Sequence, residues 1–393
     1  MKKKIIFLLT IIVLTIFAIL IKTCFNKEES SFQDNSSKQI KEENLLSMVL
    51  ETSAGSGEYE MTTASSWPTD GYVFNETLSK CENGGELSWD DTNKTVVMKT
   101  SVTDKCYVYF DIYNPKVSDF CSNGDYLAMC LAEYADNVDS SITNIYHHDG
   151  TLENGIDDGS YRYVGASSSV NNYVCFGSDD DICLAANLYR IIGVIDGKVK
   201  LIKDSSLGSM QWDSDDSNTW SKSSLNTYLN GTYLNTFSED WQAKIATTTW
   251  KVGGILSSDV TASTMYTNEM NSTTSGTDGL TEYSSKVALM YAHDYGFAAS
   301  PTAWTTTLVN YDGNDSTGTS ITTNNWLYLG SFEWLVSRRS SNSTYSCQVR
   351  SGCILSNYYY VTYSAAVRPV LFLESTVTYL DGIATSSDPI RIN

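Results

Sequence analysis

The N-terminus carries a long uncharged apolar run directly after a basic cluster. Lys2, Lys3 and Lys4 precede the apolar residues 5–21, and Lys22 closes the run. As a helix the run would span about 26 Å, slightly less than the hydrocarbon core of a bilayer. Because positively charged flanks stay in the cytoplasm, we expect everything after Lys22 to lie outside the cell.

The sequence leaves the fate of this leader open among three alternatives. No small-residue cleavage site of the A-x-A type follows it, which favours an uncleaved signal anchor over residues 1–22. Cys24, with Lys22 and Thr23 before it, matches a lipoprotein box only weakly, and a cleaved signal peptide is the third alternative. We therefore predict a single-pass protein of the cell membrane whose C-terminal part is extracytoplasmic, with residues 5–21 as its membrane contact.

Nine cysteines indicate how the exported part is stabilised. Beyond Cys24 they fall into sequential pairs with short gaps, namely Cys81 and Cys106, Cys121 and Cys130, Cys175 and Cys183, and Cys347 and Cys353. An even count outside the membrane predicts a disulfide framework. The sequence does not fix the connectivity, although sequential pairing is the simplest choice. The absence of any C-x-x-C spacing argues against zinc.

The charge balance excludes one class of partner. The chain has a formal net charge of −20, and its first 22 residues hold four lysines and no acid. The remainder therefore carries 22 basic against 46 acidic residues, a net charge of −24. Such a surface repels nucleic acid, so we expect no nucleic-acid partner.

Patterning along the chain predicts an α+β protein in several parts. Residues 23–54 read as a polar stalk with a short amphipathic helix over 40–51, because apolar residues recur at Leu45, Leu46, Val49 and Leu50. Alternating runs over 55–115 predict a small antiparallel β-module with a disulfide staple. Residues 116–159 read as a polar connector.

The last part, residues 160–393, is predicted to be an α+β domain. Asp196 and Gly197 form a strong two-residue hairpin turn between two apolar runs. Residues 224–234 have helical periodicity, and Ser238 is a suitable N-cap for a second helix. Two helices beside a loop-rich sheet predict the α+β class.

Several runs in this last part support a resemblance. The matching stretches lie at 188–193, 220–230, 326–338 and 367–373. From residue 187 onward the sequence resembles a group of uncharacterised surface proteins of Bacillota. Their C-terminal domain is similar to the C-type-lectin fold of formylglycine-generating-enzyme-like proteins. The resemblance implies a lectin-like fold and a surface location, and it implies no chemistry.

The residues that could support catalysis or metal binding are few. His147 and His148 are adjacent, so their side chains diverge, and a solvated turn is a simpler interpretation than a metal site. His293 follows an apolar stretch, which predicts a partly buried, hydrogen-bonded histidine. The acidic loops at 178–181, 213–216 and 312–315 are candidate calcium ligands, but none has the EF-hand spacing. We therefore predict no catalytic residues and no cofactor, with calcium as the alternative.

Cys347 and Cys353 have one alternative role. Formylglycine-generating enzymes use a nearby cysteine pair to bind copper and oxidise a substrate cysteine. The C-x5-C spacing here is one residue longer than that pattern, and the flanking sequence does not match. A small-loop disulfide is therefore the preferred interpretation.

Four residues are the candidates for ligand binding. Glu333 and Arg338 flank Trp334 and suggest a carbohydrate platform, although we expect Trp326 and Trp334 themselves to be core residues. In a strand, Tyr358 and Tyr360 share one face, and exposed tyrosine supplies contact area at low entropic cost; we expect that face to be exposed. We accordingly predict a surface protein that binds a protein or glycan, with an extracytoplasmic oxidase or hydrolase, or a structural envelope protein, as alternatives.

Overall fold

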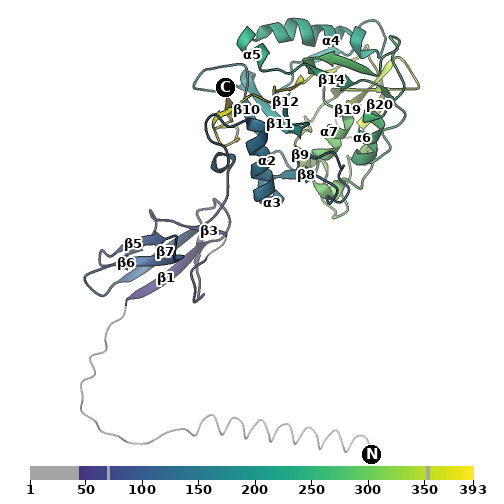
Figure 1. The fold of residues 1–393 in the computed structure, drawn as a ribbon. Coiled ribbons are helices and arrows are strands. Elements are labelled where there is room, and N and C mark those ends of the chain that lie inside the picture. The colour runs from purple at the N-terminus through teal and green to yellow at the C-terminus, as the bar shows by residue number, and fades with distance from the viewer. Residues whose placement is uncertain (1–43, 69–70, 351–354) are drawn as a thin grey trace, which may run out of the picture. The chain divides into compact units, whose positions relative to one another are not determined.

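The computed structural model describes residues 44–68, 71–350 and 355–393 of the chain (Figure 1). They form two compact units, which divide between Tyr113 and Asn114. The predicted membrane helix at 1–22 lies outside the described residues. In the part that is described, no helix is both long and apolar enough to cross a bilayer.

The first unit is built on a mixed five-stranded sheet. In sheet order the strands are β2 (Tyr59–Met61), β1 (Leu45–Glu51), β7 (Lys105–Ile112) and β3 (Tyr72–Phe74), and β4 (Lys80–Cys81) also pairs with β7. A separate hairpin joins β5 (Glu86–Asp90) to β6 (Thr95–Lys99). β1 runs parallel to β7, from Leu45 opposite Lys105 to Leu50 opposite Phe110.

One prediction for this unit is wrong. The amphipathic helix expected over 40–51 is the strand β1 where the structure describes it, and this strand adds a parallel pairing to a module whose strands between 55 and 115 pair antiparallel with one another. Met48 and Val49 are adjacent and are both buried. A strand buried on both faces loses the alternation that would identify it, so its apolar run mimics a helical pattern.

The second unit contains two larger sheets. The first has the order β17 (Val287–Ala288), β22 (Val370–Phe372), β12 (Lys198–Lys203), β11 (Leu188–Ile195), β9 (Ser160–Tyr163) and β8 (Ile145–His148), with β10 (Tyr173–Cys175) paired to β11. The second has the order β13 (Ser209–Gln211), β21 (Ser364–Ala366), β18 (Glu333–Arg339), β19 (Tyr345–Val349) and β20 (Leu355–Tyr360), with β15 (Gly254–Ile255) paired to β18. Two small ladders join β14 (Thr248–Lys251) to β16 (Glu282–Ser285) and β23 (Tyr379–Asp381) to β24 (Arg391–Ile392).

In the described part of the chain the α-helices are few and short, which overturns the predicted α+β class and its lectin-like domain. They are α2 (Leu127–Asn137), α3 (Ser140–Thr143), α4 (Ser224–Tyr228), α5 (Glu239–Ala243), α6 (Ala262–Met270) and α7 (Ala292–Phe297). The described chain is instead mostly β-sheet. α4 continues through a π-helical turn over Leu229–Tyr233, and the Ser238 side chain caps α5 as predicted.

The segment predicted as a connector, 116–159, is part of the second unit. It contains α2, α3 and β8, and Leu127, Leu131 and Ile145 belong to the main hydrophobic core. α2 packs against β11 and β12 (Figure 1). On α2 the polar residues Glu133, Asp136 and Asn137 are exposed, so they mark the solvent side of a helix and not a linker.

Three disulfides follow the sequential pairing. Cys81 bonds to Cys106, Cys121 to Cys130, and Cys175 to Cys183. Cys347 is buried and bonds to no cysteine among the described residues, and Cys353 lies outside them, so the fourth pair stays a prediction. The disulfide framework itself is confirmed.

Candidate functional site

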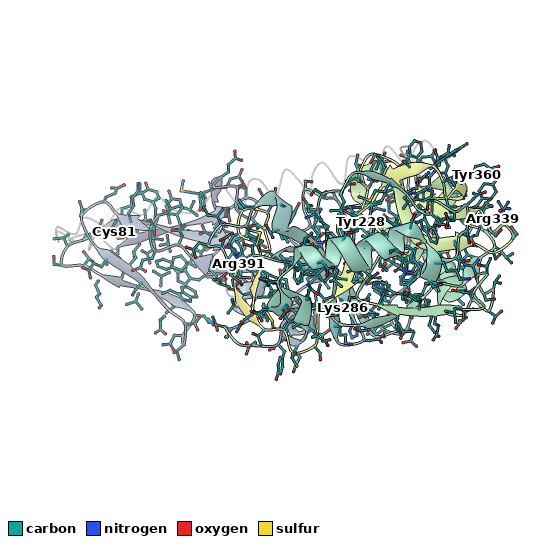
Figure 2. All side chains as sticks on the ribbon, turned by 90° about the horizontal axis from the view of Figure 1, so that it is seen from above. Cys81, Tyr228, Lys286, Arg339, Tyr360 and Arg391 are labelled. Atoms are coloured by element: carbon teal, nitrogen blue, oxygen red, sulfur yellow. A yellow bond between two sulfur atoms is a disulfide. The ribbon has the colours of Figure 1, made fainter. Side chains whose placement is uncertain are left out.

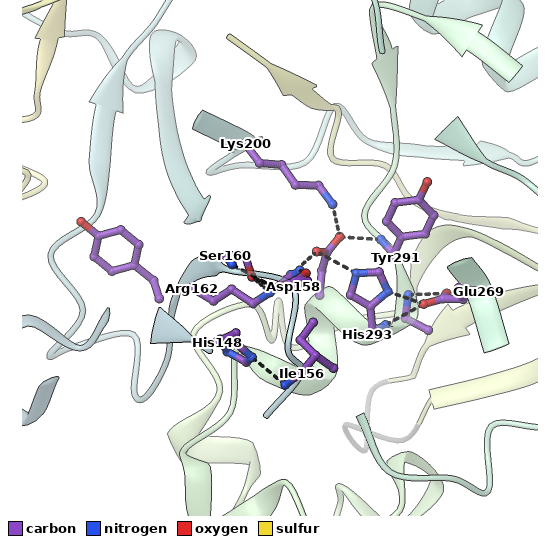
Figure 3. Close-up of polar contacts among 12 residues, drawn as sticks. His148, Ile156, Asp158, Ser160, Arg162, Lys200, Glu269, Tyr291 and His293 are labelled. Carbon is purple, nitrogen blue, oxygen red and sulfur yellow. Dashed lines mark hydrogen bonds and ion pairs between the residues drawn. The ribbon is translucent and has the colours of Figure 1, made fainter. Parts of the chain in front are cut away.

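A cluster of ionisable side chains is buried in the second unit (Figure 3). It comes from four separate stretches of sequence, and we call it the buried charge cluster: Asp158, Arg162, Lys200, Glu269, His293 and Asp294. All except Asp158 are at most 3% exposed. Burying this many charges is costly unless each is paired, so the contacts within the cluster decide what it can do.

Asp294 is the centre of this cluster. It stands in the first turn of α7, where its Oδ2 accepts a hydrogen bond from the Tyr291 backbone at 2.8 Å and from Lys200 Nζ at 2.5 Å. Arg162 reaches Oδ1 at 3.3 Å. Burial opposes ionisation of Asp294, but the neighbouring charges of Lys200, His293 and Arg162 outweigh it and lower its pKa to about 2.

His293 is held by Glu269 from α6. The His293 Nδ1 lies 2.6 Å from Glu269 Oε2, while its Nε2 lies 3.6 Å from Asp294 Oδ1. Glu269 also accepts hydrogen bonds from the backbone of Ala292 and His293 and from Ser337. His293 is hydrogen-bonded, as predicted, and is more deeply buried than expected. The row Glu269, His293, Asp294 could carry a proton between two carboxylates.

Lys200 projects from the middle of β12 into an aromatic cage. Its Nζ lies 4.7 Å from the ring centroid of Tyr291, 5.5 Å from that of Phe372 and 5.9 Å from that of Trp250. Burial lowers the pKa of this amine. Sequence reasoning did not single out Lys200, because Lys198 and Lys200, two residues apart, indicate a strand with one solvated face, whereas β12 is buried almost throughout.

The neighbouring histidines do not form a metal site together. His147 stacks on Tyr161, with ring centroids 4.1 Å apart, and its Nδ1 lies 3.3 Å from Asp136. His148 points to the other side of β8, where it packs against Phe297 and Trp304. The expected solvated turn is therefore a strand, although the predicted divergence of the two rings is observed.

Glu333 and Arg338 are not a carbohydrate platform. Glu333 is 1% exposed and forms a buried ion pair with Arg368, while Arg338 donates to the carbonyl oxygens of Val252 and Thr274. Burial raises the pKa of Glu333 despite the opposing charge of Arg368. Both candidates point into the interior because alternate residues of β18 face two packed layers; Trp334 is a core residue, as predicted.

The other part of the predicted site is exposed. A continuous row of rings crosses β19, β20 and the turn after it, and we call it the aromatic surface: Phe332, Tyr345, Tyr359, Tyr360 and Tyr363. Successive ring centroids lie 4.6–5.9 Å apart. Exposure reaches 42% for Tyr360 and 52% for Tyr363. The side chain of Tyr358 lies outside the described part of the structure.

A basic group and a buried amide support this aromatic surface. Arg339 places its guanidinium 5.9 Å from the Tyr345 ring centroid, and Figure 2 shows Arg339 and Tyr360 at the same end of the second unit. Asn218, 1% exposed, lies with Nδ2 within 3 Å of the carbonyl oxygens of Arg339, Asn342 and Tyr345. The backbone beneath the rings is therefore fixed by the core.

The acidic loops are largely occupied by their own turns. Asp213 and Asp315 accept backbone hydrogen bonds from residues that follow them. The 178–181 loop lines a hollow of about 550 Å³ with Asp381, Asp388 and Arg391. Among the described residues, the one group with converging metal-ligand atoms is Cys81, Asp104 and Cys106, whose sulfurs form a disulfide. Calcium at the acidic loops stays a prediction.

Comparison with known proteins gives one match. Residues 196–375 match a family described as a domain of unknown function, DUF6273. No curated protein and no solved structure matches the chain. The matched segment contains all of the aromatic surface and four members of the buried charge cluster, Lys200, Glu269, His293 and Asp294. Asp158 and Arg162 precede it.

Proposed function

We propose that this chain is a membrane-tethered extracytoplasmic protein that binds a protein or glycan through the aromatic surface of its second unit. The exposed row of rings is the observation that carries the proposal. Tyrosine offers a large apolar face and a polar edge, and it loses little entropy when a partner covers it. Each of the five rings contacts the next in the row, and Phe332, Tyr360 and Tyr363 are exposed, which supports an interaction site there.

The location rests on the leader and the cysteines. The apolar run at 5–21 after a basic flank favours export of the following chain. The three disulfides agree with an oxidising compartment. Binding is preferred to catalysis because His293, Glu269 and Asp294, the residues best suited to proton transfer, are at most 3% exposed.

Two experiments test the two halves of the proposal. Protease added to intact cells that express the full chain is expected to degrade the second unit and to spare a cytosolic marker. Protection of this unit in intact cells would contradict the location.

Binding is tested by displaying the full chain on cells and probing it with a glycan array and an extracellular-protein library. The double variant Tyr360→Ser/Tyr363→Ser is expected to lose roughly tenfold or more in affinity. Tyr126→Ser removes a ring of similar exposure, 50%, outside the aromatic surface and serves as the matched control. Equal loss in both variants, or no specific ligand for the native chain, would refute binding at this surface.

A further inference from the structure

Lys200 and Asp294 form a direct ion pair in the interior of the second unit. The amine from β12 and the carboxylate from α7 meet at 2.5 Å, and both residues are about 1% exposed. We propose that the folded protein joins them covalently, through an isopeptide bond between Lys200 Nζ and Asp294 Cγ. The inference is independent of the proposed ligand-binding function.

The surroundings make the amine a nucleophile. Tyr291, Phe372 and Trp250 enclose Nζ and keep bulk water away from it. Burial lowers the pKa of Lys200, which makes its uncharged form more accessible. Because the amine already touches Oδ2, its nitrogen is also within van der Waals reach of Cγ, and no further search for a reactive geometry is needed.

The remaining cluster residues fit the steps of the condensation. Lys200 first transfers one proton to the carboxylate, which gives a neutral amine beside a neutral acid. The lowered pKa of Asp294 works against this transfer, whereas burial in the aromatic cage, which lowers the pKa of Lys200, works for it. The nitrogen lone pair then attacks Cγ, and the negative charge that develops on Oδ1 faces the Arg162 guanidinium at 3.3 Å. The second proton passes from the nitrogen to Oδ2, which lies 2.5 Å away in the ion pair and then leaves as water. His293, positioned by Glu269, lies on the side of the oxyanion, with its Nε2 3.6 Å from Oδ1.

Atoms and charges balance in this reaction. One C–O bond of Asp294 breaks and one N–C bond forms. An ammonium and a carboxylate become a neutral amide, and one oxygen leaves with two protons as water. No oxidant, reductant or co-reactant is required. The product also removes two formal charges from a site where burying charge is costly, which favours the amide over the ion pair.

The test is the intact mass of the full chain, measured after denaturation and reduction. We expect the native chain to be lighter than its sequence mass by one water molecule. In a tryptic digest, a branched peptide is expected to join residues 199–203 to residues 287–338, because trypsin does not cleave after an acylated Lys200. An unshifted mass together with cleavage after Lys200 would overturn the proposal.

Two variants assign the bond. Lys200→Met keeps an apolar chain of similar length in the aromatic cage and should restore the full sequence mass. Lys251→Met removes the amine of an exposed lysine–carboxylate contact with Glu282 and should leave the water loss unchanged. If Lys200→Met does not fold, the digest of the native chain still decides, since a branched peptide through any other residue pair would refute this assignment.

Discussion

Arg368 clamps Glu333 in the core of the second unit through two parallel hydrogen bonds, Nε to Oε1 at 2.7 Å and NH2 to Oε2 at 2.8 Å. The same guanidinium donates to the Leu327 carbonyl oxygen. Glu333 and Arg368 lie on segments that are 35 residues apart, and both are at most 3% exposed. The pair therefore ties β18 to the stretch just before β22.

The first prediction concerns this clamp. Arg368→Met leaves Glu333 buried without its partner, and we expect the free energy of unfolding to fall by about 3–5 kcal/mol in urea titrations. The double variant Glu333→Leu/Arg368→Met should lose less, because no unpaired charge remains. Lys251→Met, at an exposed pair, should cost under about 1 kcal/mol. A double variant as unstable as the single one would contradict the explanation.

The second prediction concerns the pH dependence set by His148. Burial, together with the positive charge of Arg162, lowers the pKa of His148 from 6.5 to about 3. Between these pH values His148 is protonated in the unfolded chain and neutral in the folded chain. The contribution of His148 to the free energy of unfolding is therefore complete above pH 6.5 and is lost as the pH falls toward 3. The loss is on the order of 5 kcal/mol at most.

Stability measured from pH 7 to pH 4.5 checks this expectation. In the native chain the Ile156 backbone N–H donates a hydrogen bond to His148 Nδ1 at 3.2 Å. His148→Asn retains an acceptor for this N–H. This variant should show a flatter pH profile than the native chain. His147→Asn serves as the control, because His147 is partly exposed and should leave most of the slope in place. An unchanged slope in His148→Asn would show that another group titrates.

The third prediction concerns the disulfide of the first unit. Its buried cluster is small, consisting of Met48, Val108 and Phe110, so a cross-link has a large relative effect. Replacing Cys81 and Cys106 by serine should destabilise this unit by about 3 kcal/mol, seen as faster hydrogen exchange over residues 45–112. Serine at Cys175 and Cys183 should leave exchange in the first unit unchanged; equal effects would argue for a global change.

The fourth prediction concerns Gly193 on β11. A Cβ atom there would lie 2.2 Å from the Tyr161 carbonyl oxygen on the neighbouring strand β9. Gly193→Ala must push the strands apart, and we expect a loss of about 1–3 kcal/mol in thermal unfolding. Gly231→Ala, where a methyl group meets nothing within 4 Å, should be neutral or stabilising. A stable Gly193→Ala variant would show that β9 can move freely.

Local signals were read correctly where the structure is set by neighbouring residues. Asp196 and Gly197 both have positive φ, 50° and 69°, as the predicted hairpin turn requires. The N-cap formed by the Ser238 side chain was likewise predictable, because it depends only on residues next to it in the sequence. Tyr360 is exposed, as expected, while the side chain of Tyr358 lies outside the described part of the structure.

Contacts between residues far apart in the chain could not be predicted from the sequence alone. No residue close to Glu333 in the sequence indicates that Arg368 is its partner, so the sequence suggests a binding platform where the structure has an interior ion pair. Likewise, only the partners β2 and β7 turn the apolar run at Leu45–Glu51 into a strand. Lys200 and Asp294, 94 residues apart, could be matched only once the fold had brought them together.

The parallel pairing of β1 and β7 determines how the first unit would respond to mechanical load. A pull that separates the start of β1 from the end of β7 drags the two strands past each other along their length. The ladder from Leu45 and Lys105 to Leu50 and Phe110 is then loaded in shear, so its hydrogen bonds share the force and do not unzip one after another. A domain with this strand pairing resists extension, so it can act as a stiff spacer between the N-terminal residues and the second unit.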